Sequence, residues 1–179
     1  GPSVATFFAE LGAKVIKIEN PLVGDVTRSW KLPTESKEAT VSAYFSSVNY
    51  GKEYQKLNYS VEEDRTKFLE LIAKADILLT NFKQGDAEKF RLTKDDLFQV
   101  NPRLIHGRIS GFGSESDRVA YDLILQAETG FMSMNGTPDS GPVKMPVALI
   151  DVLAAHQLKE GLLLALLQRI SDNAGKTVD

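Results

Sequence analysis

Two aspartates have the type and the surroundings for covalent chemistry. Asp151 lies inside the apolar run 147–155. An unpaired carboxylate is costly to bury, so such an aspartate is either well hydrogen-bonded or functional. Asp122 comes just before a second apolar segment, where its structural role would be that of a helix N-cap. The pattern alone leaves a structural and a functional interpretation open for both carboxylates.

Polar and basic residues also follow one of the apolar runs. Asn81 and Lys83 come directly after the run 77–80, and Lys83 and Lys89 flank a predicted helix start. Open parallel sheets bind ligands at the carboxyl ends of their strands, and helix N-termini with lysines bind phosphate. The alternative interpretation is structural: Asn81 would cap a loop, and the two lysines would be solvated surface residues.

Composition excludes several kinds of site. The 179 residues contain no cysteine and two histidines, which excludes disulfides, thiolate metal sites, Fe–S clusters and a His-rich metal site. Gly111 and Gly113 form a G-x-G without the third glycine, and no G-x-x-x-x-G-K-[ST] or G-x-S-x-G motif occurs. The net charge of −3 gives no general attraction to nucleic acid. No apolar run reaches the ~18 residues that would cross a bilayer, and no signal peptide is visible. We therefore expect no metal, nucleic acid or membrane.

Helix-then-strand patterns indicate the fold class. An amphipathic stretch, a short turn and a β-branched run follow one another three times, which predicts an α/β fold with an open parallel sheet and flanking helices. We expect Ile16, Leu78 and Ile105 on its central strands. The three units are residues 4–19, 61–81 and 94–110.

The remaining segments are less regular. Residues 19–40 are expected to form a surface excursion, 43–58 a short helix and a strand, and 135–146 a loop. A wide apolar stripe predicts a long helix over 147–170. Ser60 with Glu63 three residues later has the pattern of a capping box.

A series of short motifs resembles one known family. The motifs are the helix and strand of 8–19, G-D-V-T-R at 24–28, N-Y-G-K at 49–52, A-D-I-L-L-T-N-F at 75–82, N-P-R-L-I at 101–105, I-S-G-F-G at 109–113 and Y-D at 121–122. Their order and spacing resemble those of the class III CoA-transferases, the CaiB/BaiF family, whose superfamily includes formyl-CoA transferase, carnitine CoA-transferase and α-methylacyl-CoA racemase.

The resemblance implies a Rossmann-like large domain that is incomplete in this chain. Residues 1–179 would be part of that domain, without its first strand, the small domain and the C-terminal segment. Members of the family form interlocked homodimers, so a dimer is expected for the full-length protein, together with a cytoplasmic location. The isolated piece would be inactive.

The resemblance also implies site residues. Asp151 falls at the position of the family's nucleophile, and Asp122 would position the acyl group or the reacting carboxylate. The substrates would be an acyl-CoA and a carboxylic acid, and coenzyme A (CoA) is the only cofactor implied. The implied CoA contacts are Asn20, Leu57, Ser60, Asn81, Phe82, Lys83, Lys89 and Arg118.

The implied reaction passes through an aspartyl anhydride and an aspartyl-CoA thioester. Backbone N–H groups near Gly111 or Asp151 are expected to hold the oxyanion. An α-methylacyl-CoA racemase is the alternative enzyme, although Tyr121 occupies the position of its histidine and neutral tyrosine is a poor base near pH 7. A non-catalytic CoA-binding fragment is the alternative from another class.

Overall fold

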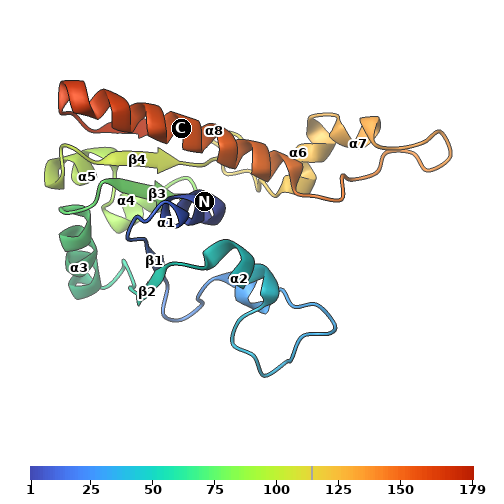
Figure 1. Cartoon of the computed structure of the whole chain (residues 1–179), viewed down its shortest axis with the longest axis horizontal. Coiled ribbons are helices and arrows are strands. Elements are labelled where there is room, and N and C mark those ends of the chain that lie inside the picture. The colour runs from blue at the N-terminus through green and yellow to red at the C-terminus, as the bar shows by residue number, and fades with distance from the viewer. Residues whose placement is uncertain (114) are drawn as a thin grey trace. The chain divides into compact units, whose positions relative to one another are not determined.

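A computed structural model describes residues 1–113 and 115–179, which form two compact units, Gly1–Ala75 and Asp76–Asp179 (Figure 1). Each unit combines short parallel strands with helices. The first contains α1 (Pro2–Glu10), β1 (Ile16–Glu19), the 3-10 helix η1 (Val26–Ser29), α2 (Ala43–Asn49), β2 (Glu53–Lys56) and α3 (Glu62–Ile72). The second contains β3 (Ile77–Thr80), α4 (Asp86–Phe90), α5 (Lys94–Val100), β4 (Ile105–Arg108), α6 (Asp122–Glu128), α7 (Phe131–Met134), α8 (Leu149–Asp172) and β5 (Lys176–Val178).

Strands β1 and β2 of the first unit pair in parallel, with Ile16 opposite Glu53. Helix α1 packs against α2, and the Thr6 hydroxyl donates to the Val48 carbonyl oxygen at 2.6 Å. Val4 of α1 and Phe45 of α2 are both buried. Burial of these side chains stabilises the unit by the removal of apolar surface from water.

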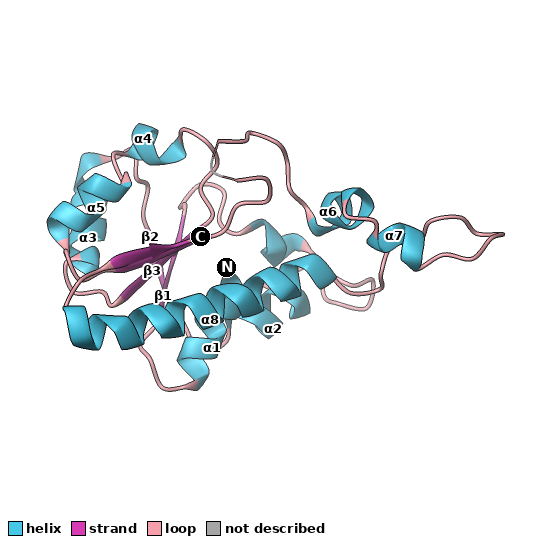
Figure 2. Ribbon diagram, turned by 90° about the horizontal axis from the view of Figure 1, so that it is seen from above, coloured by secondary structure: helices cyan, strands magenta, loops and turns pink. Residues whose placement is uncertain are grey.

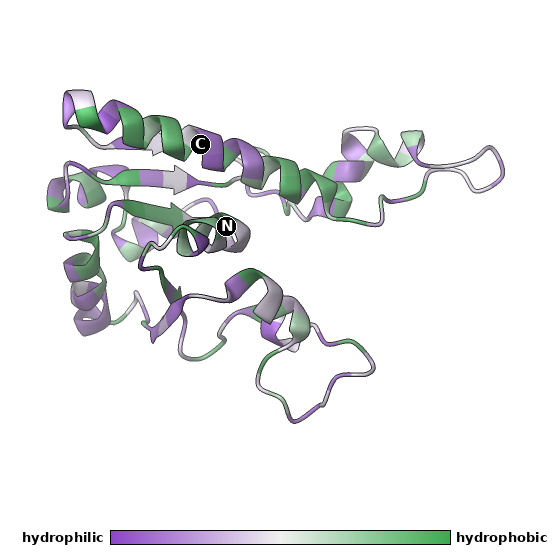
Figure 3. Cartoon of the chain, viewed as in Figure 1, coloured by the Kyte–Doolittle hydropathy of each residue, from purple (hydrophilic) through white to green (hydrophobic). Residues whose placement is uncertain are grey.

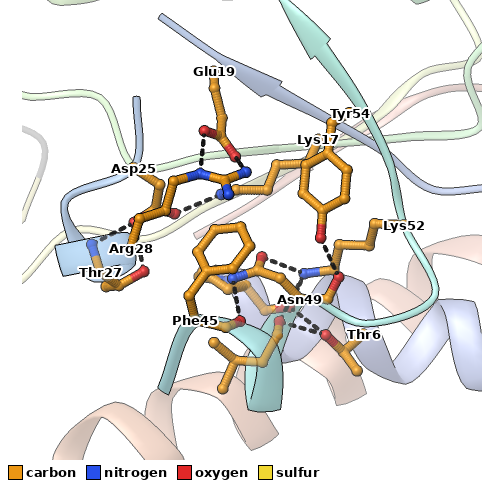
Figure 4. Close-up of polar contacts among 12 residues, drawn as sticks. Thr6, Lys17, Glu19, Asp25, Thr27, Arg28, Phe45, Asn49, Lys52 and Tyr54 are labelled. Atoms are coloured by element: carbon orange, nitrogen blue, oxygen red, sulfur yellow. Dashed lines mark hydrogen bonds and ion pairs between the residues drawn. The ribbon is translucent and has the colours of Figure 1, made fainter. Parts of the chain in front are cut away.

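A cluster of charged side chains ties the excursion after β1 to the strand (Figure 4). The Arg28 guanidinium donates to both carboxylate oxygens of Glu19, at 2.9 and 2.8 Å, and lies 3.9 Å from the centre of the Phe45 ring. Beside it, Lys17 and Asp25 form an ion pair at 2.7 Å. The two-pronged contact with an almost fully buried carboxylate fixes the geometry of this turn, because the planar guanidinium matches the carboxylate.

The second unit is built on a three-stranded parallel sheet in the order β3-β4-β5. Figure 2 shows α8 along one side of this sheet and α4 and α5 on the other. Leu158 and Leu162 of α8 are buried. Gly161 allows the close approach of α8 to β5, since an added Cβ would lie 2.6 Å from Cγ1 of Val178.

The structure confirms the α/β class and the parallel pairing, and it corrects the prediction of one sheet with three central strands. Ile16 belongs to the two-stranded sheet of the first unit, and Leu78 lies on an outer strand of the second sheet. Ile105 alone lies on a central strand. A β-branched apolar run, such as β3 in green in Figure 3, favours a strand but does not select its partner.

Most of the other predicted elements are confirmed. Residues 43–58 contain α2 and β2, residues 135–146 form a loop closed by a bridge between Thr137 and Gly141, and the long helix is α8. Strand β5 was not predicted from the sequence. It pairs with β4 over Lys176–Val178, a segment too short to carry a periodic signal.

The capping box predicted at Ser60 is wrong. Val61 occupies the N-cap position of α3 and makes no side-chain cap hydrogen bond, while the Asp64 carboxylate accepts from the Asn58 N–H at 2.9 Å. A capping box does form at the start of α5, where Thr93 and Asp96 satisfy each other's backbone amides. A side chain within α3, that of Asp64, therefore holds the turn before the helix, and the N-cap residue Val61 does not.

His106 makes the second unit sensitive to acid. Its side chain is 4% exposed, and Nε2 lies 2.9 Å from the Thr80 hydroxyl. Within residues 1–113 and 115–179, its Nδ1 has no hydrogen-bond partner. Burial, with a smaller contribution from the Arg108 charge, lowers the pKa of His106 to about 4 from an ordinary value of 6.5.

Between these two pH values the unfolded chain binds a proton that the folded chain does not. Stability is therefore lost as the pH falls below about 6.5, and the loss reaches about 2 kcal/mol at pH 5. Urea unfolding of the whole protein at pH 7 and pH 5 measures this loss, which His106→Gln is expected to reduce. The exposed His156 provides the matched control, His156→Gln, which should keep the wild-type pH dependence. An equal pH dependence in wild type and His106→Gln would contradict the assignment.

Candidate active site

Asp151 lies in the first turn of α8 with its side chain exposed. The sequence-based expectation of a carboxylate buried in an apolar run is therefore wrong for the chain as described. Val152 and Leu153, which follow it, are each 48% exposed, so the apolar run is the start of a partly exposed helix. A carboxylate in this place is available to a second molecule.

Asp122 holds the start of α8. Its Oδ1 accepts from the backbone N–H groups of Ile150 and Asp151, at 2.8 and 3.2 Å. It does not cap its own helix, because α6 begins at Asp122 and Tyr121 occupies the N-cap position without a side-chain cap bond. The N-cap interpretation thus fails for α6, and the carboxylate caps a different helix.

These two hydrogen bonds bear on the expectation that backbone N–H groups near Gly111 or Asp151 hold the oxyanion, which stays a prediction. The N–H groups of Ile150 and Asp151 are engaged by Asp122, and that of Val152 donates to the Ala148 carbonyl oxygen at 3.0 Å. The first amides of a helix need partners outside it, and here a carboxylate supplies two of the bonds.

The surroundings of Asp151 change the acidity of its carboxylate. Although much of its side chain reaches the surface, the Asp151 carboxylate is partly desolvated, and this raises its pKa above the ordinary value of 3.8. The nearby charge of Asp122 raises the pKa of Asp151 further. A raised pKa makes a carboxylate a better nucleophile once it is ionised.

Gln126, which the sequence analysis missed, joins the same cluster. It is 1% exposed and lies one turn after Asp122 in α6. Its side-chain amide donates to Asp122 and to the Val147 carbonyl oxygen, and accepts from the Met145 N–H. The available signal was a glutamine four residues after the aspartate, directly after the apolar residues 123–125.

The predicted CoA contacts of the second unit follow the end of β3. Asn81, Lys83 and Lys89 are exposed, and the Phe82 ring lies 6.1 Å from that of Phe90. The turn is held by the Lys83 N–H, which donates to the Asp86 carboxylate at 3.1 Å. The segment therefore presents two exposed cations and an aromatic pair at the carboxyl end of a parallel strand.

The predicted contacts of the first unit also follow strand ends. Asn20 comes directly after β1, is exposed, and its side-chain oxygen accepts from the Leu22 N–H at 2.9 Å. Leu57 follows β2 and is buried. Ser60 is exposed, and its N–H donates to the Asn58 side chain at 3.1 Å.

Arg118 has partners of its own. It forms an ion pair with Glu128, and its guanidinium lies 3.8 Å from the centre of the Phe112 ring. The loop that carries it doubles back tightly, since a Cβ on Gly111 would lie 1.7 Å from that of Ala120.

Two further features were searched for in the described part of the chain, residues 1–113 and 115–179. No group of three His, Asp or Glu side chains there is arranged to hold a metal ion. No helix there has both the length and the apolar character to cross a bilayer.

Comparison with known proteins decides the family. The profile of CoA-transferase family III matches residues 1–179, the whole chain. The chain belongs to CoA-transferase family III. This assignment confirms the resemblance seen in the sequence motifs.

Curated relatives of this family III chain are named as CoA-transferases. It is 34% identical over 185 residues to a succinate–glutarate CoA-transferase of Agrobacterium fabrum, and 38% identical over 183 residues to an acetyl-CoA:oxalate CoA-transferase of Acetobacter aceti. Each comparison covers 100% of this chain and 46% of the relative, so the chain spans about half the length of the curated relatives it matches.

A solved structure agrees with the fold of the family III chain. A CaiB/BaiF family protein from Brucella suis superimposes with a TM-score of 0.92 at 35% sequence identity. The match covers 99% of this chain and 48% of that protein.

Proposed function

We propose that the whole protein containing this chain transfers CoA from an acyl-CoA to a carboxylic acid, with Asp151 as the covalent nucleophile. The observation that carries the proposal is an exposed carboxylate in the first turn of a 24-residue helix, whose backbone N–H donates to a second carboxylate, Asp122. Partial desolvation, and after it the Asp122 charge, raise the pKa of Asp151. The named activities of the family III relatives support the reaction class.

The proposed transfer needs no reactant besides the two substrates. The Asp151 carboxylate attacks the thioester carbonyl carbon, a C–O bond forms, the C–S bond breaks, and an anhydride and CoA thiolate result. The thiolate attacks the aspartyl carbonyl and releases the first carboxylate, which leaves an aspartyl-CoA thioester. The acceptor carboxylate repeats the two steps in reverse and regenerates Asp151. Covalent catalysis of this kind divides one difficult exchange into easier ones.

We further propose that CoA binds along the segment after β3. Asn81, Phe82, Lys83 and Lys89 support this because they combine exposed cations with an aromatic surface at the carboxyl end of a strand. Asn20, Leu57 and Ser60 follow strand ends of the first unit and are proposed as further contacts. The homodimer, the cytoplasmic location and the inactivity of the isolated chain stay predictions.

Lys89→Glu is expected to raise the dissociation constant for CoA about tenfold, because a charge-assisted phosphate contact is replaced by a repulsive one. Isothermal calorimetry with the whole protein measures the change. Lys94→Glu is the matched control, since Lys94 is also exposed and lies 5.9 Å from a phenylalanine ring, compared with 5.4 Å for Lys89. Equal constants for both variants would remove Lys89 from the site.

A further inference from the structure

We infer that Gln126 is a positioning residue for the Asp151 carboxylate, acting through Asp122 and the segment that leads into α8. The inference rests on the proposed function, because the position of the Asp151 carboxylate affects the rate only if Asp151 is the nucleophile. No motif or comparison assigns a role to Gln126, which lies on α6 and not on the helix that carries the nucleophile.

The side-chain amide of Gln126 is buried and fully engaged. Nε2 donates to Oδ2 of Asp122 and, at 3.0 Å, to the carbonyl oxygen of Val147. Oε1 accepts from the backbone N–H of Met145 at 2.8 Å. A buried amide with all these bonds made is an ordered link, since breaking any one leaves a polar group unsatisfied.

These bonds hold both sides of the α8 start. Gln126 fixes the backbone at Met145 and Val147, just before the helix, while Asp122 accepts from Ile150 and Asp151 inside it. Ala148, at the N-cap position of α8, provides no side-chain cap. The first turn of α8 therefore takes its orientation from α6, through one glutamine and one aspartate.

The orientation of this turn determines where the nucleophile lies. A carboxylate attacks efficiently only from a near-attack geometry, with reacting atoms about 3–3.5 Å apart, and a displacement of about 1 Å lowers the rate about 100-fold. Gln126 touches neither substrate nor the Asp151 carboxylate in the bonds described, so it acts by placement and not by chemistry.

The test uses Gln126→Met, which keeps the side-chain length and removes the polar contacts, and Gln126→Glu, which replaces the donor to Asp122 with a carboxylate oxygen. Gln99→Glu is the control, since Gln99 is exposed on α5. In the whole protein, both Gln126 variants should lower kcat between about 10- and 100-fold, with an unchanged dissociation constant for CoA. Gln126→Glu should also move the acid limb of kcat/KM to higher pH, because it adds negative charge beside Asp122 and Asp151.

Hydrogen exchange provides a readout that does not depend on turnover. The amides of Met145, Ile150 and Asp151 should exchange faster in Gln126→Met than in wild type or Gln99→Glu, with other α8 amides unchanged. Faster exchange there together with wild-type kcat overturns the inference. Equal losses of CoA affinity, kcat and melting temperature also overturn it, because they indicate a general structural role. Absence of CoA transfer by the wild type overturns the proposed function instead, and is recognised before any variant is made.

Discussion

Replacing Asp151 with alanine in the whole protein is expected to lower CoA transfer by at least about 10³-fold while CoA binding stays close to that of the wild type. The carboxylate forms the covalent bond, whereas the proposed CoA contacts follow β3, on other residues. Asp151→Asn should behave in the same way, because an amide is a poor nucleophile. Steady-state transfer and calorimetry with CoA measure the two effects separately.

The covalent intermediate can be located directly. Incubation of the wild type with acyl-CoA and hydroxylamine should give a hydroxamate on the peptide that contains Asp151, identified by mass spectrometry. Asp95→Ala is the matched control, since Asp95 is also exposed in the first turn of a helix and should transfer at the wild-type rate. An adduct on Asp122, or transfer by Asp151→Ala, would show that the nucleophile lies elsewhere.

An isotope-exchange assay on the wild-type protein distinguishes CoA transfer from racemisation. A racemase exchanges the α-proton of a 2-methylacyl-CoA with solvent deuterium, and a transferase does not require this exchange. Tyr121 is 64% exposed next to Asp122 and stands where the racemase branch is expected to have its histidine. Deuterium incorporation without transfer would support the racemase alternative.

The second large expected effect concerns stability. Arg28→Met should lower the free energy of unfolding by about 3 kcal/mol, because it leaves the Glu19 carboxylate buried without its cation. The Glu19 side chain is 6% exposed and receives two hydrogen bonds from Arg28. Urea unfolding of the whole protein at neutral pH measures the loss.

A second substitution separates the buried charge from lost packing. Glu19→Gln in the Arg28→Met background should recover part of the stability, since a neutral amide is less costly to bury than a carboxylate. Lys67→Met removes the exposed Lys67–Glu63 ion pair and should change stability far less. If Arg28→Met lowered the free energy of unfolding by no more than Lys67→Met does, the buried Arg28–Glu19 pair would contribute little to stability.

The sequence predicts which segments are helices and strands better than it predicts which strands pair. The runs containing Ile16 and Leu78 both have the composition of strands, yet they lie in different sheets. Pairing depends on contacts between distant segments, which local propensity does not encode. For the same reason β5 was missed, since Lys176–Val178 becomes a strand only because β4 lies beside it.

The candidate site shows the same division. The motifs identify Asp122 and Asp151, but they do not predict that the first would accept from the backbone amide of the second at 3.2 Å. Gln126 gave only a weak signal, because a polar residue beside an apolar stretch of a helix has many structural explanations. Its role becomes visible only through partners 19 and 21 residues away in the chain.

The position of β5 has a consequence for the order of events during synthesis. Strands β4 and β5 pair with Ile105 opposite Lys176, and the chain between these two residues includes all of α8. Closing the long loop between β4 and β5 has an entropic cost, and this cost is offset only when the contacts of β5 with β4 and α8 form. While the ribosome is still making residues 149–175, the side of α8 that carries Gly161 lacks Val178 of β5, which lies against it in the folded unit. A nascent chain paused in this interval would be a target for chaperones that bind apolar helices.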